Sequence, residues 1–199
     1  VFKFEDFSVF KEQKSILSRV NLEVPSKGLT LISGPSGSGK TTLLLAMISG
    51  LLENSGLDHT GRRFGIHGKR GATNPEQEPV QLVLEAPFLF PGSILDNFRL
   101  VSRSITRQEV VNHLKALGLS LEDRIEDKNP SLSTGQIKRI GIARALATTP
   151  KLLIIDEPLA NLDKNAKAKV QEALENLAEN RSVVVASHIG TFNPKRSYS

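Results

Sequence analysis

The sequence contains no cysteine and no tryptophan, and only one tyrosine and one methionine. Without cysteine the chain can form neither a disulfide framework nor a cysteine-based zinc cluster, which fits a reducing compartment. With one tyrosine and no tryptophan, a stacking platform for single-stranded nucleic acid has little support.

Long hydrophobic runs are also missing. A membrane-spanning helix needs about 20 consecutive apolar residues. The longest apolar stretch, Leu43–Leu52, is shorter than that and is interrupted by Ser49 and Gly50. We therefore expect no direct membrane span in this chain.

The composition otherwise suits one folded domain, with 199 residues of which 39% are hydrophobic. The net charge is +5, and basic residues gather at 62–70 and at Lys195 and Arg196. Such a charge is compatible with nucleic acid or an anionic lipid surface, but a solvated basic face is the more common explanation. The chain begins with Val1 and its only methionine is Met47, so we expect a fragment or a processed product.

Apolar segments of strand and helix character alternate along the chain. Strands are predicted at residues 1–10, 16–24, 29–33, 80–84, 152–156 and 182–187, and helices at 106–118, 133–148 and from 163 onward. The first two strands should pair antiparallel, and 29–33 should be short and buried. Residues 53–79 read as a loop with at most short strands.

The segments LLIID (152–156) and SVVVAS (182–187) are continuous apolar runs. Such runs are typical of strands that are buried on both faces of a parallel sheet. Strands that alternate with helices therefore predict an α/β fold with a mostly parallel sheet. The helices between 93 and 148 have no strand among them and read as a helical insertion.

Residues 34–41 read GPSGSGKT and match G-x-x-x-x-G-K-[ST] between a predicted strand and a predicted helix. The glycines let backbone N–H groups surround phosphates, Lys40 reaches the β- and γ-phosphates, and the Thr41 hydroxyl binds Mg²⁺. The sequence therefore predicts an ATP site. Its residues are Gly34, Pro35, Ser36, Gly37, Ser38, Gly39, Lys40, Thr41 and Thr42.

Two carboxylates follow one another where the strand 152–156 ends. Asp156 is placed to hold Mg²⁺, and Glu157 could polarise a water for attack on the γ-phosphate. The alternative is a solvated pair at a strand end. His188 follows the strand 182–187, and ligands of α/β sheets bind at such carboxyl ends. A lone histidine is as often structural, so its position alone leaves both roles open.

The stretch SLSTGQIKR (131–139) begins a predicted helix in an unusual way. Ser133 and Gln136 have the S-x-x-Q spacing of a capping box, which satisfies two N–H groups at a helix start. Thr134 and Gly135 leave the remaining N–H groups uncovered. An uncovered helix start attracts anions, above all phosphate.

The motifs LSTGQ, IKRIGIARAL, LLIIDEP, ANLD and SH, after the phosphate loop, together resemble the ATP-binding cassette (ABC) ATPases in order and spacing. The resemblance covers residues 2–188. It implies a P-loop NTPase core, an antiparallel β subdomain with the phosphate-loop part of the core (1–84), a helical subdomain with the signature motif (85–148) and the rest of the core (149–199).

In that family two cassettes pack head to tail, and each signature helix binds the γ-phosphate held by its partner. The resemblance therefore implies that a second cassette is a partner of this chain. It assigns nucleotide contacts to Phe10, which would stack on adenine, and to Ser133, Gly135, Gln136 and Asp163. It also implies that Glu157 is the catalytic glutamate and that His188 is the switch histidine.

Three departures from the family pattern stand out. Thr134 replaces a glycine of the signature, and only eleven residues follow His188, so the fold is expected to be trimmed or the chain cut. Glu85 takes the place of a glutamine that senses Mg²⁺ and the transport partner. A carboxylate there would compete for metal and crowd Asp156 and Glu157 with like charge, so we expect altered Mg²⁺ dependence.

Residues 87–97 (PFLFPGSILDN) are similar to a stretch common in exporter-type cassettes, where this region faces a transmembrane partner. Phe88 and Phe90 would suit such docking, although packing inside the helical subdomain is nearly as good an explanation. We expect an Mg²⁺-dependent ATPase that powers transport, with a lean to export, at the cytoplasmic face of a membrane through its transporter partner.

Three alternatives remain. The first is a soluble ABC ATPase that acts on DNA or ribosomes, which the basic charge mildly favours but which lacks a coiled-coil insertion, a second cassette and a long linker here. Nucleic acid is accordingly not the expected partner. The others are a P-loop kinase or nucleotide-binding module without turnover, and an inactive regulatory cassette.

Overall fold

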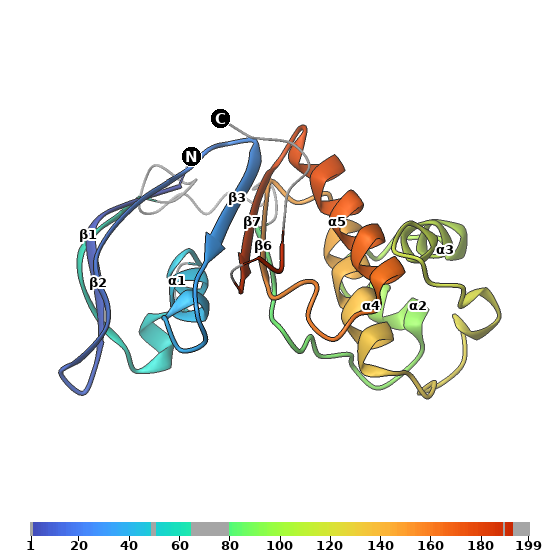
Figure 1. The fold of residues 1–199 in the computed structure, drawn as a ribbon. Helices are drawn as coiled ribbons and strands as arrows, with labels where there is room; N and C mark the ends of the chain where they lie inside the picture. Colours follow the sequence, from blue (N-terminus) through green and yellow to red (C-terminus); the bar gives the residue numbers. More distant parts are fainter. Residues whose placement is uncertain (1, 49–50, 65–79, 189, 193–199) are drawn as a thin grey trace.

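The computed structural model describes residues 2–48, 51–64, 80–188 and 190–192. The chain forms two sheets that interleave in sequence, because β3 of one sheet precedes β4 of the other (Figure 1). The elements are β1 (Phe2–Lys11), β2 (Lys14–Val24), β3 (Gly28–Ser33), α1 (Lys40–Ala46), η1 (Glu53–Ser55), β4 (Asp58–Phe64), β5 (Val80–Val83), α2 (Ile94–Arg99), α3 (Arg107–Ala116), η2 (Glu122–Arg124), α4 (Thr134–Leu146), β6 (Leu152–Asp156), α5 (Lys164–Ala178) and β7 (Ser182–Ser187).

The N-terminal sheet has the order β2-β1-β4, and both pairings are antiparallel. The predicted antiparallel pair of strands is therefore confirmed. For 53–79 the sequence predicted a loop with at most short strands, and the structure forms one strand there, β4, whose seven residues pair along β1. Its sequence, DHTGRRF, has no alternation of apolar and polar residues, and nearly all of its residues are exposed. The strand is therefore formed by its pairing with β1. Of the basic stretch, 65–70 lie outside the described residues, as do Lys195 and Arg196.

The second sheet has the order β3-β7-β6-β5, and all of its described pairs are parallel. Every residue of β6 and β7 is buried, as their apolar runs predict. β3 differs from the prediction of a buried strand. It lies at an edge of the sheet, where Leu31 keeps 36% of its surface exposed.

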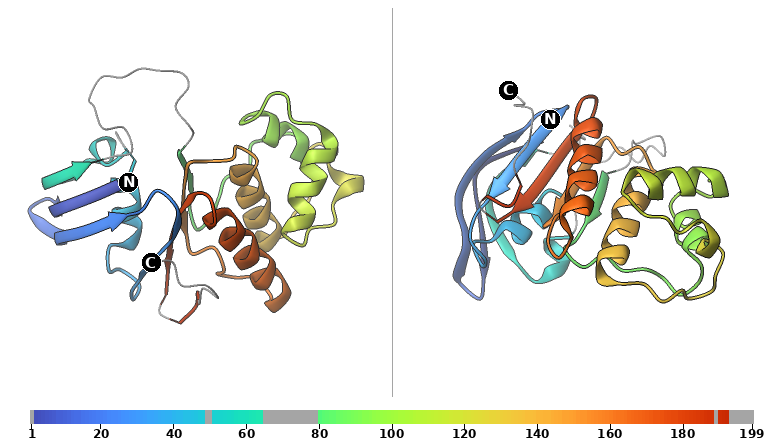
Figure 2. Two further views of the ribbon diagram at one scale, coloured as in Figure 1. Left: turned by 90° about the horizontal axis from the view of Figure 1, so that it is seen from above. Right: turned by 45° about the vertical axis from the view of Figure 1, so that its right-hand side comes forward.

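Alternate residues of β6 and β7 belong to two separate hydrophobic cores. Leu152 and Ile154 pack with α1 and the antiparallel sheet, whereas Leu153 and Ile155 pack with the helices α2 to α5. This follows from the strand geometry, because successive side chains point to opposite faces. The parallel sheet thus stands between the antiparallel sheet and the helical region (Figures 1 and 2).

Capping boxes begin the three helices of the segment between β5 and β6. Those at Thr106 and Ser133 were predicted from their spacing and are confirmed, and Ser93 with Asp96 forms a third at the start of α2. None of the described helices is long and apolar enough to cross a membrane. The division of the chain at 84/85 and 148/149 stays a prediction.

Candidate functional site

The parallel sheet brings four distant segments to one edge. Parallel strands end at the same edge of a sheet, so the residues after β3, β5, β6 and β7 meet there. These are the phosphate loop, Glu85, Glu157 and His188. They surround a cavity of about 270 Å³, whose lining residues are Ile16, Ser36, Gly37, Gly39, Lys40, Thr41, Thr42, Glu85, Asp156, Glu157 and His188.

The phosphate loop is held from two sides. The Gly34 N–H donates a 3.4 Å hydrogen bond to the Ser187 carbonyl at the end of β7. On the other side β2 closes over Gly39, which has a φ of 88°. A Cβ atom at Gly39 would lie 2.7 Å from Leu17 Cδ2, so both the backbone angle and the packing require glycine. Lys40, the first residue of α1, donates to the carbonyls of Gly34 and Pro35 at 3.0 Å each.

Thr41 and Asp156 meet at the centre of the cavity. The Thr41 hydroxyl donates a 2.5 Å hydrogen bond to Asp156 Oδ2. A hydroxyl and a carboxylate are oxygen ligands that suit Mg²⁺, which is usually completed by water and substrate phosphates rather than by a full protein cage. The donor set of one hydroxyl and one carboxylate therefore fits Mg²⁺ bound together with a nucleotide.

Glu157 is buried and has an unusual backbone conformation. It adopts a φ of 46° in the turn after β6, and its N–H donates to the Ala186 carbonyl at 2.9 Å. Its Oε2 accepts long hydrogen bonds of 3.4 Å from the Ser187 hydroxyl and the His188 N–H. A non-glycine residue with positive φ stores strain that is often found at functional sites.

The other carboxylate oxygen of Glu157, Oε1, is buried and has no hydrogen-bond partner among the described residues. Two nitrogen atoms lie within ion-pair distance of it but beyond good hydrogen-bond distance, Lys40 Nζ at 3.8 Å and His188 Nε2 at 3.5 Å. A buried carboxylate oxygen without a hydrogen bond calls for a partner, and a water in the cavity would supply it. The geometry therefore suits Glu157 to act as a general base.

Several predicted residues lie away from this cavity. Phe10, half-buried in β1, does not line it, whereas Ile16 of β2 does. The adenine contact of Phe10 stays a prediction. Ile16 was missed, because an aliphatic residue in an alternating strand carries no sign of a ligand contact.

The signature residues Ser133, Gly135 and Gln136 do not line the cavity either. The Ser133 N–H donates to Gln136 Oε1 at 2.8 Å, and the Gln136 N–H donates to the Ser133 hydroxyl at 3.3 Å. These side chains complete the capping box of α4 and leave its first N–H groups at an exposed helix start. The helix start is thus separate from the phosphate loop of its own chain.

Asp163 is likewise engaged within the chain. Its carboxylate accepts hydrogen bonds of 2.9 Å from the N–H groups of Asn165 and Ala166 and so caps α5. The bond from Ala166 contributes most to holding the pKa of Asp163 below its usual range. The nucleotide contact predicted for Asp163 stays a prediction.

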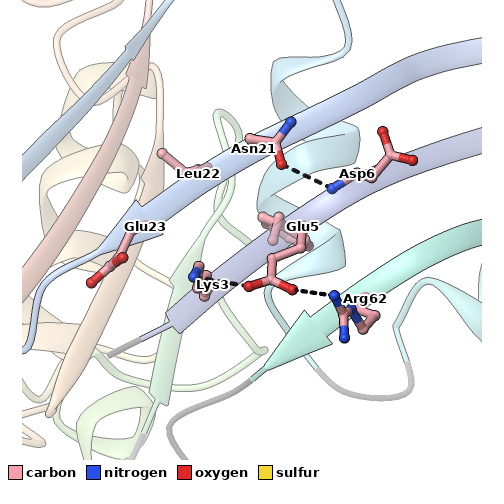
Figure 3. A pocket seen from close by; sticks show the side chains of 8 residues that line it. Lys3, Glu5, Asp6, Asn21, Leu22, Glu23 and Arg62 are labelled. Carbon is pink, nitrogen blue, oxygen red and sulfur yellow. Dashed lines mark hydrogen bonds and ion pairs between the residues drawn. The ribbon is translucent and has the colours of Figure 1, made fainter.

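A second hollow, of about 530 Å³, lies on the antiparallel sheet and shares no lining residue with the first. Figure 3 shows Glu5 between Lys3 and Arg62, with ion pairs of 2.9 and 3.0 Å. Lys3 pairs with Glu5 along β1, and Arg62 of β4 pairs with Glu5 across the strands, which is the ordinary stabilisation of an exposed sheet face. We assign it no function.

Comparison with known proteins gives consistent matches. The family model described as ABC transporter matches residues 17–160. A phosphate import ATP-binding protein PstB from Mycoplasma mobile is 33% identical over 205 residues, which cover 94% of this chain and 72% of that protein. A protein of the same name from Thermococcus kodakarensis is 32% identical over 198 residues, covering 92% of this chain and 78% of that protein.

Solved structures agree on the fold. A structure of an ATP-binding subunit of an ABC transporter superposes with a TM-score of 0.74 at 24% identity, covering 95% of this chain and 80% of that one. A putative ABC transporter ATP-binding protein from Pyrococcus furiosus gives a TM-score of 0.75 at 22% identity, covering 94% and 90%.

Proposed function

Since the chain belongs to the ABC transporter family and is an ATPase of that family, we propose that it powers a transporter by Mg²⁺-dependent ATP hydrolysis at the cavity described above. The observation that carries this proposal is the convergence of the phosphate loop, the Thr41–Asp156 pair and the open Oε1 of Glu157 at one sheet edge.

Each group has a distinct role in the proposed reaction. The phosphate-loop N–H groups and Lys40 bind the β- and γ-phosphates of ATP, and Thr41 and Asp156 hold Mg²⁺. The metal ion supplies positive charge that neutralises the phosphates. Glu157 Oε1 orients the attacking water and accepts its proton, while the contacts of Glu157 with Ser187 and His188 hold the carboxylate in place.

We further propose that two chains form each complete site, head to tail. The start of α4 offers uncovered N–H groups and the Ser133 hydroxyl to solvent, away from the phosphate loop of the same chain. A helix start of this kind binds phosphate. The γ-phosphate held by one chain would therefore complete its contacts on the signature helix of the second chain.

Docking to a transmembrane partner is proposed at the loop before α2. Phe88 and Phe90 are 65% and 52% exposed and contact each other edge to face, with ring centroids 5.1 Å apart. The alternative that they pack inside the helical region is therefore wrong. An exposed aromatic pair is typical of an interaction surface. Through this partner the chain would lie at the cytoplasmic face of a membrane.

The expected direction of transport, export, has no support from the comparisons. The curated relatives are named as phosphate import proteins, although residues 87–97 read as exporter-like. Export is therefore not part of the proposal. A soluble role on DNA or ribosomes finds no specific observation in the described structure to favour it.

The proposal is tested by Mg²⁺-ATP turnover measured over a range of protein concentrations. Because two chains form each site, the rate should rise more than linearly with concentration. Glu157→Gln should lower turnover by about 10²-fold or more and retain an ATP-bound dimer in size-exclusion chromatography. The matched control is Glu172→Gln, an exposed carboxylate on α5. Normal hydrolysis by Glu157→Gln would refute the assignment of the base.

A further inference from the structure

Lys138 is a charged side chain that the proposed reaction does not use. It lies in the second turn of α4 and is only 5% exposed. Its ammonium donates hydrogen bonds to the carbonyls of Glu157 at 2.9 Å and Ala160 at 3.2 Å. Lysine is almost never buried to this extent unless it is paired, so its position needs an explanation.

The turn that Lys138 holds is the one that presents Glu157. This turn needs support, because Glu157 has a positive φ and, among the described residues, its carboxylate accepts only the two long hydrogen bonds from Ser187 and His188. The two bonds from Lys138 tie the backbone of the turn to α4, while the Glu157 N–H ties it to β7. A shift of the turn would move Oε1 relative to the phosphate loop.

Lys138 also faces an acidic cluster. Burial lowers the pKa of Lys138, while the negative charges of Glu85, Glu157 and Asp156 act in the opposite direction, that of Glu85 most strongly. These three carboxylates belong to residues that line one cavity, and Lys138 bonds to the backbone carbonyl of one of them, Glu157. On the cavity side Lys40 Nζ lies 3.8 Å from Glu157 Oε1. Like charges at close range destabilise one another unless a cation lies among them.

We propose that Lys138 is a positioning residue, which holds the turn of Glu157 and offsets the negative charge that Glu85 adds to the site. It acts through Glu157 and not on the nucleotide, because Lys138 does not line the cavity and its ammonium bonds to the two carbonyls of the turn. The inference rests on the proposed function for its effect on turnover, whereas the coupling that we infer between Lys138 and Glu85 should also change the unfolding midpoint.

A double-mutant cycle tests the proposal. The variants are Lys138→Met, Glu85→Gln and their combination, measured for kcat, KM for Mg²⁺-ATP and thermal unfolding midpoint. Lys138→Met should lower kcat by about tenfold and change KM less than about threefold, because the phosphate loop is untouched. In the Glu85→Gln background the same change should lower kcat by only about twofold. Lys138→Arg should restore part of the lost rate.

The control cycle uses Lys169→Met and Glu172→Gln, an exposed ion pair of 3.1 Å on α5, whose effects should be additive and small. If Lys138→Met costs the same with and without Glu85→Gln, in turnover and in unfolding, the proposal is overturned. If the unchanged protein shows no turnover at all, the proposed function fails instead. The unfolding midpoints then test the coupling between Lys138 and Glu85. Non-additive changes of the midpoint support this coupling, and additive changes refute it.

Discussion

The Thr41 hydroxyl and the Asp156 carboxylate are joined by a 2.5 Å hydrogen bond, although 115 positions separate them in the chain. One residue follows the phosphate loop and the other ends β6. Their contact places two oxygen ligands side by side. Such pre-organisation reduces the cost of building a metal site.

Removing the Thr41 hydroxyl should therefore weaken Mg²⁺ binding more than it lowers the stability of the fold. We expect Thr41→Val to raise the Mg²⁺ concentration for half-maximal turnover by about tenfold or more, because the isosteric side chain lacks the ligand oxygen. Thr60→Val, at an exposed position of β4, serves as the control. An unchanged Mg²⁺ titration for Thr41→Val would exclude this residue from the metal site.

Glu85 should influence the metal as well, since it lines the cavity near Asp156 and Glu157. Removing its charge in Glu85→Gln should raise the half-saturating Mg²⁺ concentration by about tenfold, while turnover at saturating Mg²⁺ stays within about threefold. Titration of the ATPase rate with Mg²⁺ measures both. If neither the rate nor the metal dependence changes, Glu85 has no part in the chemistry.

Gly141 marks a close approach between α4 and the segment before α2. A Cβ atom there would lie 2.6 and 2.7 Å from Cβ and Cγ of Pro87. Gly141→Ala should therefore destabilise the fold by about 1–3 kcal/mol, although alanine favours helices. Denaturant unfolding measures the change. Combining it with Pro87→Gly should cost less than the sum of the two single changes, and strict additivity would contradict the contact.

The cap of α5 should make stability depend on pH. The pKa of Asp163 is lowered in the folded chain, so the stabilisation by its ionised carboxylate is fully present above the unfolded pKa. It is lost as the pH falls through the folded value. Asp163→Ala should consequently lower the unfolding midpoint at pH 7, and this difference should shrink in acid. A difference that stays constant down to strongly acidic pH would argue against the ionised cap.

The exposed aromatic pair should matter only to the transporter. Phe88→Ser with Phe90→Ser should leave folding and turnover of the isolated chain unchanged, because both rings are exposed. In cells the double variant should no longer pellet with membranes. Phe64→Ser, which removes an exposed ring on β4, is the matched control and should pellet normally. Equal pelleting of all three proteins would place the docking surface elsewhere.

The loop that carries these rings is held by hydrogen bonds from α2 and α4. Asn97, 3% exposed, bonds to both the N–H and the carbonyl of Phe90 at 2.8 and 2.9 Å. Arg144 of α4 bonds to the Phe88 carbonyl at 3.0 Å. These bonds fix the backbone of the loop in a conformation that exposes both rings.

Local sequence patterns determined several helix starts, the buried strands and the phosphate loop of this protein. The capping boxes at Thr106 and Ser133, the buried strands β6 and β7 and the phosphate loop follow from residue types at fixed spacings. Their physical causes act over a few residues: N–H groups that need acceptors, apolar runs that need burial and glycines that permit positive φ.

Tertiary structure decided what depends on pairing across the chain. β4 is polar and became a strand only beside β1, while β3 became an edge strand because nothing in the described sheet pairs with its other side. The open oxygen of Glu157, the buried ammonium of Lys138 and the exposure of Phe88 likewise depend on which segments meet. Burial and distance arise from contacts between residues far apart in sequence, and no local pattern encodes them.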